Sequence, residues 1–259
     1  MNERECHHRV RARLALMAVL MSVGLAGVAG RADAQMSAGE HKTMIGWADT
    51  WFLLLEQLEY SARGPERPAS LEARSWYGGA NSRVWLRAEG EQSTAGPDRA
   101  GEGEAQLLYG RLVAPYWDAV IGLRGDRRWG DGNSGRMLLA IGLFGLSPYR
   151  FEVEPTLFVG TKGELSARMN AVFPLLITQR LILEPRMELD GALKAVPSFG
   201  VRKGLSGYNV GFRLRYEFKR EFAPYVGIVR TRGADPIGSS PGLRSSAENR
   251  LVVGLRMWR

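Results

Sequence analysis

Charged and apolar residues alternate in the segment RLILEPRMELD, which spans residues 180–190. Glu184 and Glu188 flank Arg186 at a spacing of two, so in an extended chain all three side chains point to the same side. Paired carboxylates can in principle perform acid–base chemistry. However, the chain has only three histidines and one cysteine, and of these only His41 lies beyond residue 34. A nucleophile–histidine pair is therefore missing, and we predict that the protein is not an enzyme.

The first 34 residues have the parts of a secretory signal peptide. The basic stretch MNERECHHRVRAR precedes the apolar run LALMAVLMSVGLAGVAG, and Ala32 and Ala34 match the small-residue cleavage pattern. A transmembrane anchor is the alternative, but the run is short and rich in glycine. We predict a signal peptide at 1–34 and a short periplasmic tail at 35–49. The exported chain then has no cysteine and no disulfide.

The remaining chain is moderately basic. Residues 35–259 carry 30 basic and 24 acidic residues, a net charge of +6. The arginines alternate with glutamates instead of forming a basic cluster, so we expect no nucleic-acid partner.

Period-two alternation recurs along the rest of the chain. The segment VGFRLRYEFK places Val210, Phe212 and Leu214 on one side and Arg213 and Arg215 on the other. This pattern predicts half-exposed strands. We expect twelve strands, at about 51–62, 70–79, 82–93, 104–115, 117–128, 136–147, 150–160, 164–176, 180–191, 206–218, 221–231 and 249–258.

The connections between these segments alternate in length. Short ones, such as GGANS at 78–82, alternate with longer ones, such as STAGPDRAGEG at 93–103. Outer-membrane barrels have this asymmetry, with short periplasmic turns and longer outer loops. A soluble sandwich is the alternative, but its strands are typically shorter. We therefore predict an all-β fold, an antiparallel transmembrane β-barrel of about twelve strands at residues 50–259. Tyr116, Tyr149 and Tyr225 follow Pro near short turns and are expected to form an aromatic girdle.

In such a barrel the charged side of each strand faces an enclosed lumen. One hypothesis is a path for cations, with carboxylates attracting them. The other is a network of salt bridges that fills a narrow lumen, in which opposite charges offset each other's desolvation. The expected lumen-facing residues are Glu152, Glu154, Glu184, Arg186, Glu188, Arg213, Arg215 and Glu217.

Several long segments carry a family resemblance. EQLEY (56–60), WLRAEGE (85–91), LVAPYWDAVIGLRGD (112–126), GLSPYRFEVEPTLFVG (145–160) and LLITQRLILEPRMEL (175–189) resemble the copper resistance protein B family. The resemblance runs from about residue 44 to the C-terminus. It implies a bacterial outer-membrane barrel in contact with outer-membrane lipid and connected with copper tolerance. It also implies partners among periplasmic copper oxidases and copper chaperones.

The N-terminal tail departs from this family, whose members often carry a Met- and His-rich stretch there. Here the stretch is reduced to Met36, His41 and Met44. Thioether and imidazole groups are suitable copper ligands, so these three residues are candidates for a weak copper site. We expect a protein that binds copper ions or passes them across the outer membrane. The alternative is a general small-solute channel or structural barrel without copper preference.

Overall fold

A computed structural model describes residues 50–62, 67–94, 100–130, 133–199, 201–232 and 247–259. These residues belong to the compact unit Ile45–Arg259. The predicted signal peptide and tail, with Met36, His41 and Met44, lie outside the described residues. Within the described ranges, no helix has the length and apolar character needed to cross a membrane.

Almost every described residue outside the connections lies in a strand. The strands are β1 (Thr50–Ser61), β2 (Ala69–Gly78), β3 (Ser82–Gln92), β4 (Gly101–Ala114), β5 (Trp117–Trp129), β6 (Ser134–Ser147), β7 (Phe151–Gly160), β8 (Leu165–Val172), β9 (Leu175–Leu176), β10 (Leu181–Ala192), β11 (Gly204–Tyr216), β12 (Phe222–Arg232) and β13 (Glu248–Trp258). Two short 3₁₀ turns occur, η1 (Pro148–Arg150) and η2 (Pro197–Phe199).

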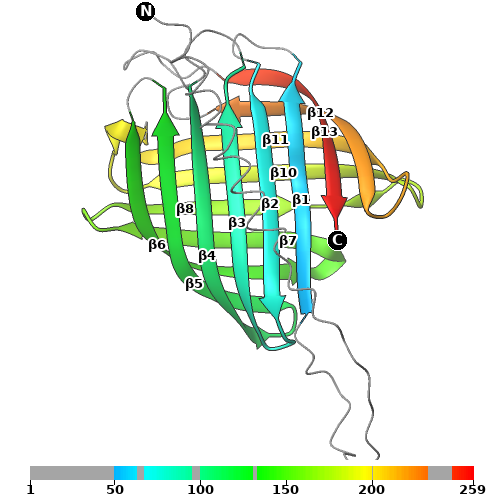
Figure 1. The fold of residues 1–259 in the computed structure, drawn as a ribbon, viewed down its shortest axis with the longest axis horizontal. Coiled ribbons are helices and arrows are strands. Elements are labelled where there is room, and N and C mark those ends of the chain that lie inside the picture. Colours follow the sequence, from blue (N-terminus) through cyan, green and yellow to red (C-terminus); the bar gives the residue numbers. More distant parts are fainter. Residues whose placement is uncertain (1–49, 63–66, 95–99, 131–132, 200, 233–246) are drawn as a thin grey trace, which may run out of the picture. The chain divides into compact units, whose positions relative to one another are not determined.

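The strands form one closed antiparallel sheet. Each strand pairs with its neighbours in chain order, and β13 closes the sheet by pairing with β1. β8 and β9 both pair with β10 and share one strand position, which is interrupted at Phe173 and Pro174. The result is a twelve-position barrel, as predicted. In Figure 1, β1 to β6 form the near wall, and β10, β11 and β12 cross behind it with a strong inclination.

The two ends of the barrel sequence meet at one rim. Leu53 and Arg259 exchange two backbone hydrogen bonds of 2.9 Å. Neighbouring strands run in opposite directions, so every second connection lies at the same rim. The connections at this rim are short, as 79–81 between β2 and β3 illustrates. We call this end the short-turn rim and the opposite end the long-loop rim.

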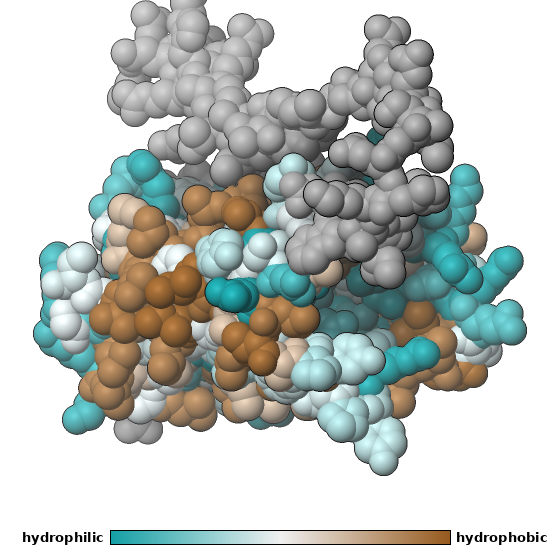
Figure 2. Space-filling view, turned by 90° about the horizontal axis from the view of Figure 1, so that it is seen from below, coloured by the Kyte–Doolittle hydropathy of each residue, from teal (hydrophilic) through white to brown (hydrophobic). Residues whose placement is uncertain are grey.

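Side chains are distributed in the opposite way to a soluble protein. Phe212 is 55% exposed, whereas its neighbour Arg213 is only 4% exposed. Across the sheet Phe212 pairs with Ile228, which is also exposed, and Arg213 pairs with Gly227 on the inner side. Hydrophobic residues therefore gather on the outer surface, as the side seen in Figure 2 shows. This arrangement is typical of strands whose outer side contacts lipid.

One part of the inner surface is apolar. Leu108, Val120, Leu138, Phe144 and Phe158, from β4 to β7, form a buried cluster on that wall. Two inward-facing arginines lie against its aromatic rings, with Arg124 4.3 Å from the Phe158 ring centre and Arg87 5.2 Å from that of Phe144. The cluster therefore supports the charged groups described below.

A glycine in β5 allows the sheet to form at this wall. A Cβ on Gly122 would lie 2.0 Å from the backbone oxygen of Leu107 on β4. We expect Gly122→Ala to destabilise the barrel by about 1–3 kcal/mol, because backbone must move to relieve the overlap. Gly125→Ala is the matched control, since nothing lies within 4 Å of its Cβ. Urea unfolding followed by tryptophan fluorescence measures both, and equal midpoints for the two variants would contradict the expectation.

Candidate functional site

Ion pairs fill the interior of the barrel, and every base in them is an arginine. In the described part of the chain eleven arginines pair with sixteen carboxylates. The arginines are Arg74, Arg83, Arg87, Arg124, Arg128, Arg136, Arg168, Arg186, Arg213, Arg215 and Arg250. The carboxylates are those of Glu56, Glu59, Glu72, Glu89, Glu91, Glu102, Glu104, Asp118, Asp126, Glu154, Glu164, Glu184, Glu188, Asp190, Glu217 and Glu248.

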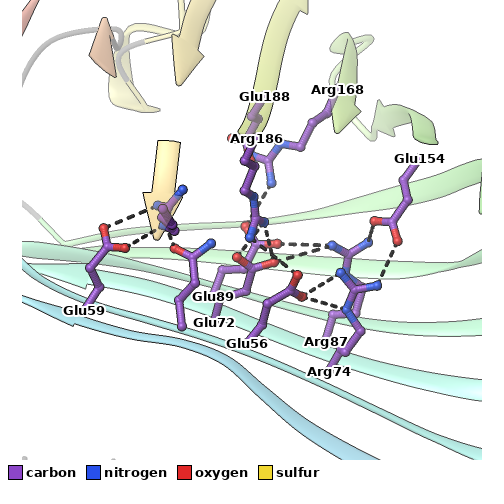
Figure 3. A network of polar contacts seen from close by, with 12 residues as sticks. Glu56, Glu59, Glu72, Arg74, Arg87, Glu89, Glu154, Arg168, Arg186 and Glu188 are labelled. Atoms are coloured by element: carbon purple, nitrogen blue, oxygen red, sulfur yellow. Dashed lines mark hydrogen bonds and ion pairs between the residues drawn. The ribbon is translucent and has the colours of Figure 1, made fainter. Parts of the chain in front are cut away.

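The first group of pairs crosses the lumen from β2 and β3 to β7. Arg74 donates a 3.0 Å hydrogen bond to one oxygen of Glu154, and Arg87 donates one of 2.8 Å to the other. Arg74 also donates to Glu56 on β1 at 2.8 Å. Because β7 is four or five strand positions from β3 and β2, these side chains span the interior instead of following the wall (Figure 3).

A second crossing joins β10 to β2. Arg186 uses Nη2 to contact both carboxylate oxygens of Glu72, at 2.7 and 2.6 Å, and its Nη1 lies 3.6 Å from Glu56. All three side chains are buried. Such charge-assisted bonds are short and strong, so Arg186 holds two opposite walls together.

Arg168 on β8 is surrounded by four carboxylates. Its Nη1 lies 3.1 Å from both Glu89 on β3 and Glu104 on β4, and its Nε lies 2.9 Å from Asp190 and 3.7 Å from Glu188 on β10. Two of these carboxylates have a second arginine, since Arg124 lies 2.7 Å from Glu104 and Arg87 lies 3.7 Å from Glu89. Within the described ranges, Glu188 and Asp190 are ion-paired with Arg168 alone, so the excess of negative charge lies on β10.

A buried amide lies beside this acidic group. Asn170 is paired in register with Glu154 on β7 and with Glu188 on β10. Its side chain is 6% exposed, and its Oδ1 has no hydrogen-bond partner in the part of the chain that the structure describes. A buried acceptor of this kind is usually satisfied, so Asn170 offers an oxygen to a ligand or a water molecule.

Of the remaining predicted residues, Glu184, Arg215 and Glu217 lie near the short-turn side, whereas Arg213 borders the loop-side cavity. Arg213 donates to Glu59 at 2.9 Å, and Arg215 donates to Glu184 at 2.6 Å and lies 3.7 Å from Glu217. Glu152 is half-buried on β7, two residues before Glu154, and no ion pair joins it to another described residue.

The prediction that Tyr225 belongs to an outer aromatic girdle is wrong. Tyr225 is buried, and its hydroxyl donates a 3.1 Å hydrogen bond to Glu59. Its ring lies over Gly254 of β13, where a Cβ would approach the ring to 2.4 Å. The ring can turn inward because glycine leaves room for it. Tyr116 and Tyr149 are exposed at short turns, with φ of 67° and 66°.

A cavity of about 380 Å³ occupies the loop-side half of the lumen. Glu89, Glu104, Glu188 and Asp190 line it together with Arg168. Nearer the long-loop rim the same cavity is lined by residues of both charges, Glu91, Glu102, Glu248, Arg127, Arg128 and Arg250. The crossing pairs of Arg74 and Arg87 with Glu154 lie beyond the lining of this cavity.

The interior provides oxygen ligands and no sulfur. Among the described methionines, Met137, Met169 and Met257 are exposed and Met187 is half-buried on the outward side of β10. No set of three or more His, Cys, Asp or Glu residues in the described ranges is arranged to hold a metal ion. The groups that the described interior offers to a cation are carboxylate and amide oxygens.

Comparison with known proteins decides the family. The model of the family "Copper resistance protein B precursor (CopB)" matches residues 49–259. Copper resistance protein B of Escherichia coli is 41% identical over 213 residues, which cover 82% of this chain and 70% of that protein. The chain belongs to the copper resistance protein B family.

One further relative agrees with this assignment, and one solved structure agrees with the fold. A copper resistance protein B homolog of Pseudomonas syringae pv. tomato (strain ATCC BAA-871 / DC3000) is 40% identical over 148 residues, 56% of this chain and 49% of that protein. The solved NanC porin has a TM-score of 0.51 at 14% identity and covers 79% of this chain and 98% of its own, which supports the barrel fold alone. The resemblance noted in the sequence is thus confirmed, and this family member has a barrel whose lumen is crossed by ion pairs.

Three arginines that organise the lumen were not among the predicted lumen-facing residues: Arg74, Arg87 and Arg168. In EARSWY the outward positions are Ala73 and Ser75, so the alternation that marks Arg74 is weak. A usable signal exists in the pairing: Arg74 lies opposite Arg87 in the β2–β3 register, and two adjacent arginines facing inward require acidic partners from elsewhere.

Proposed function

We propose that this protein is an outer-membrane barrel that contributes to copper resistance by binding copper ions in its lumen or passing them across the outer membrane. The family assignment supports the connection with copper. The observation that supports the lumen as the place of contact is the pair of Glu188 and Asp190 on β10, two carboxylates that share Arg168 as their one ion-pair partner among the described residues. Glu89 and Glu104 lie on the other side of that guanidinium. Excess carboxylate in an enclosed space attracts cations, because the surrounding wall has a low dielectric constant.

The ligand type favours Cu(II) over Cu(I) as the ion in the lumen. Carboxylate and amide oxygens are hard ligands, whereas Cu(I) prefers thiolate and thioether sulfur. Glu188, Asp190 and the unpartnered Oδ1 of Asn170 are the groups we assign to the ion. Among the four carboxylates around Arg168, Glu188 is the most available, since its nearest arginine nitrogen is 3.7 Å away.

The proposed contact is transient. A copper ion must compete with Arg168 for the same oxygens, and that guanidinium cannot be deprotonated at physiological pH. Transient binding suits an ion that is passed on. Met36, His41 and Met44 of the tail are proposed as a second, weak contact, where the ion could be exchanged with a periplasmic oxidase or chaperone. No step in this proposal is catalytic.

A copper-sensitivity assay tests the proposal in cells. Deleting the gene should increase copper sensitivity, and the wild-type gene should restore growth. Glu188→Gln/Asp190→Asn should restore growth only partly, because it removes charge from the acidic group. Met36→Ala/His41→Ala/Met44→Ala should retain most of the resistance if the lumen is the main contact.

Glu221→Gln is the matched control, since Glu221 is an exposed acid in the β11–β12 turn. It should restore growth as the wild type does, with protein levels in the outer membrane compared for all variants. Equal sensitivity with and without the gene would contradict the copper role and favour a general channel or a structural barrel.

A further inference from the structure

Six basic side chains lie together on the outer edge of the long-loop rim. Lys162 is in the β7–β8 connection, Lys194 follows β10, and Arg202 and Lys203 precede β11. Arg230 is on the outward side of β12, paired in register with Val210 of β11, and Arg232 is at the strand end opposite Tyr208, where it also borders the lumen cavity. All six are exposed. We call these six residues the basic rim patch.

The members of the patch lie on neighbouring strands or on the connections next to them. β8, β10, β11 and β12 are adjacent in the sheet. Three spacings between them correspond to about 14 Å. The Lys194 ammonium donates a 3.3 Å hydrogen bond to the backbone oxygen of Lys162, so the first two members touch. The patch is wider than one phosphate group and is suited to a head group that carries more than one.

The charges of the patch are not neutralised within the described ranges. None of the six has a carboxylate oxygen within 4.0 Å there, in contrast to the arginines of the lumen. The segment 191–204 contains no acidic residue. Glu164, the nearest acid in the β7–β8 connection, is 3.9 Å from the lumen-facing Arg136. Unpaired cations clustered on one surface indicate an anionic partner.

Exposed leucines lie next to the cations. Leu193 is 67% exposed and Leu205 is 65% exposed, and Leu193 donates its backbone N–H to the oxygen of the exposed Leu165 at 2.9 Å. A surface with cations beside exposed apolar side chains is complementary to an anionic amphiphile, with acyl chains against the leucines and the head group against the cations.

We propose that the basic rim patch binds the phosphate groups of a phosphorylated outer-leaflet glycolipid of the lipopolysaccharide type. The orientation of the patch toward the outer leaflet rests on the proposed outer-membrane placement, but the binding does not depend on copper. The lipid anchors one side of the barrel, from β8 to β12.

Native mass spectrometry of the full mature protein in non-ionic detergent tests the proposal. The probes are bisphosphorylated lipid A and the same lipid with both phosphates removed. Wild type should bind the bisphosphorylated form at least about tenfold more tightly, since several basic residues each contribute attraction to an anionic head group. Lys162→Gln/Lys194→Gln/Arg202→Gln/Lys203→Gln should lose this preference.

The matched control removes the same number of exposed charges from the other rim, as Arg150→Gln/Arg180→Gln/Lys219→Gln/Arg220→Gln. It should keep the preference. Equal loss in both variants would show a general charge effect and overturn the proposal, as would equal binding of the dephosphorylated lipid. If inorganic pyrophosphate displaced the lipid completely, the patch would be a site for free phosphate groups, and the glycolipid proposal would be overturned. The assay contains no copper, so failure of the copper role leaves its result unchanged.

Discussion

Arg186→Met is expected to destabilise the barrel by about 3–5 kcal/mol, because removing one partner of a buried pair leaves the other charge unpaired. Arg186 contacts both oxygens of Glu72 and lies 3.6 Å from Glu56, and all three side chains are buried. Methionine retains much of the volume of the arginine side chain, so the loss of stability reports the missing charge and not a cavity. Urea unfolding in detergent, followed by tryptophan fluorescence, measures the change.

Two controls separate this effect from general ones. The double variant Arg186→Met/Glu72→Gln should recover part of the lost stability, since it removes one of the two carboxylate charges that Arg186→Met leaves unpaired. Arg128→Met should cost less than about 1 kcal/mol, because its partner Glu102 is half exposed and such pairs contribute little. Equal destabilisation by Arg186→Met and Arg128→Met would contradict a structural role for the crossing pairs.

Removing the arginines that cross to β7 should open the lumen. Arg74 and Arg87 reach Glu154 from the opposite wall, at 3.0 and 2.8 Å. Arg74→Ala/Arg87→Ala clears both guanidinium groups and leaves Glu56, Glu72 and Glu154 lining the passage. We expect a several-fold increase in single-channel conductance in planar bilayers, and stronger selectivity for cations, since the fixed charge becomes more negative.

The wild type should conduct weakly in the same experiment. Arg150→Ala/Arg180→Ala removes two exposed arginines from the short-turn rim and should leave the conductance as in the wild type. Heat-modifiable migration on gels shows that each variant is folded. Unchanged conductance in a folded Arg74→Ala/Arg87→Ala barrel would mean that these side chains do not obstruct the lumen.

Much of the fold could be predicted from the sequence because alternate residues of each strand face lipid and lumen, which require apolar and polar side chains respectively. The strand at Gly204–Tyr216 is an example, since Phe212 and Arg213 differ sharply in exposure. The strand predicted at 164–176 was interrupted, since Pro174 has no N–H to donate and separates β8 from β9.

The partners within the site could not be predicted in the same way. Alternation places Arg186 and Glu188 inside, but it does not say that Arg186 meets Glu72, 114 residues away, or that Glu188 keeps only a distant arginine. Those contacts depend on which walls face each other once β13 has closed on β1. Tyr225 illustrates the same limit, because the glycine that admits its ring lies on another strand.

Electron paramagnetic resonance of bound Cu(II) tests most directly whether the lumen holds copper. The sample is residues 35–259 with Met36→Ala/His41→Ala/Met44→Ala, so that the segment before the barrel contributes no sulfur or imidazole. We predict a bound Cu(II) signal with oxygen ligands and no nitrogen coupling, which is lost when Glu188→Gln/Asp190→Asn is added. Absence of bound Cu(II) in the tail variant, or a signal unaffected by the lumen substitutions, would contradict the proposed role of the lumen.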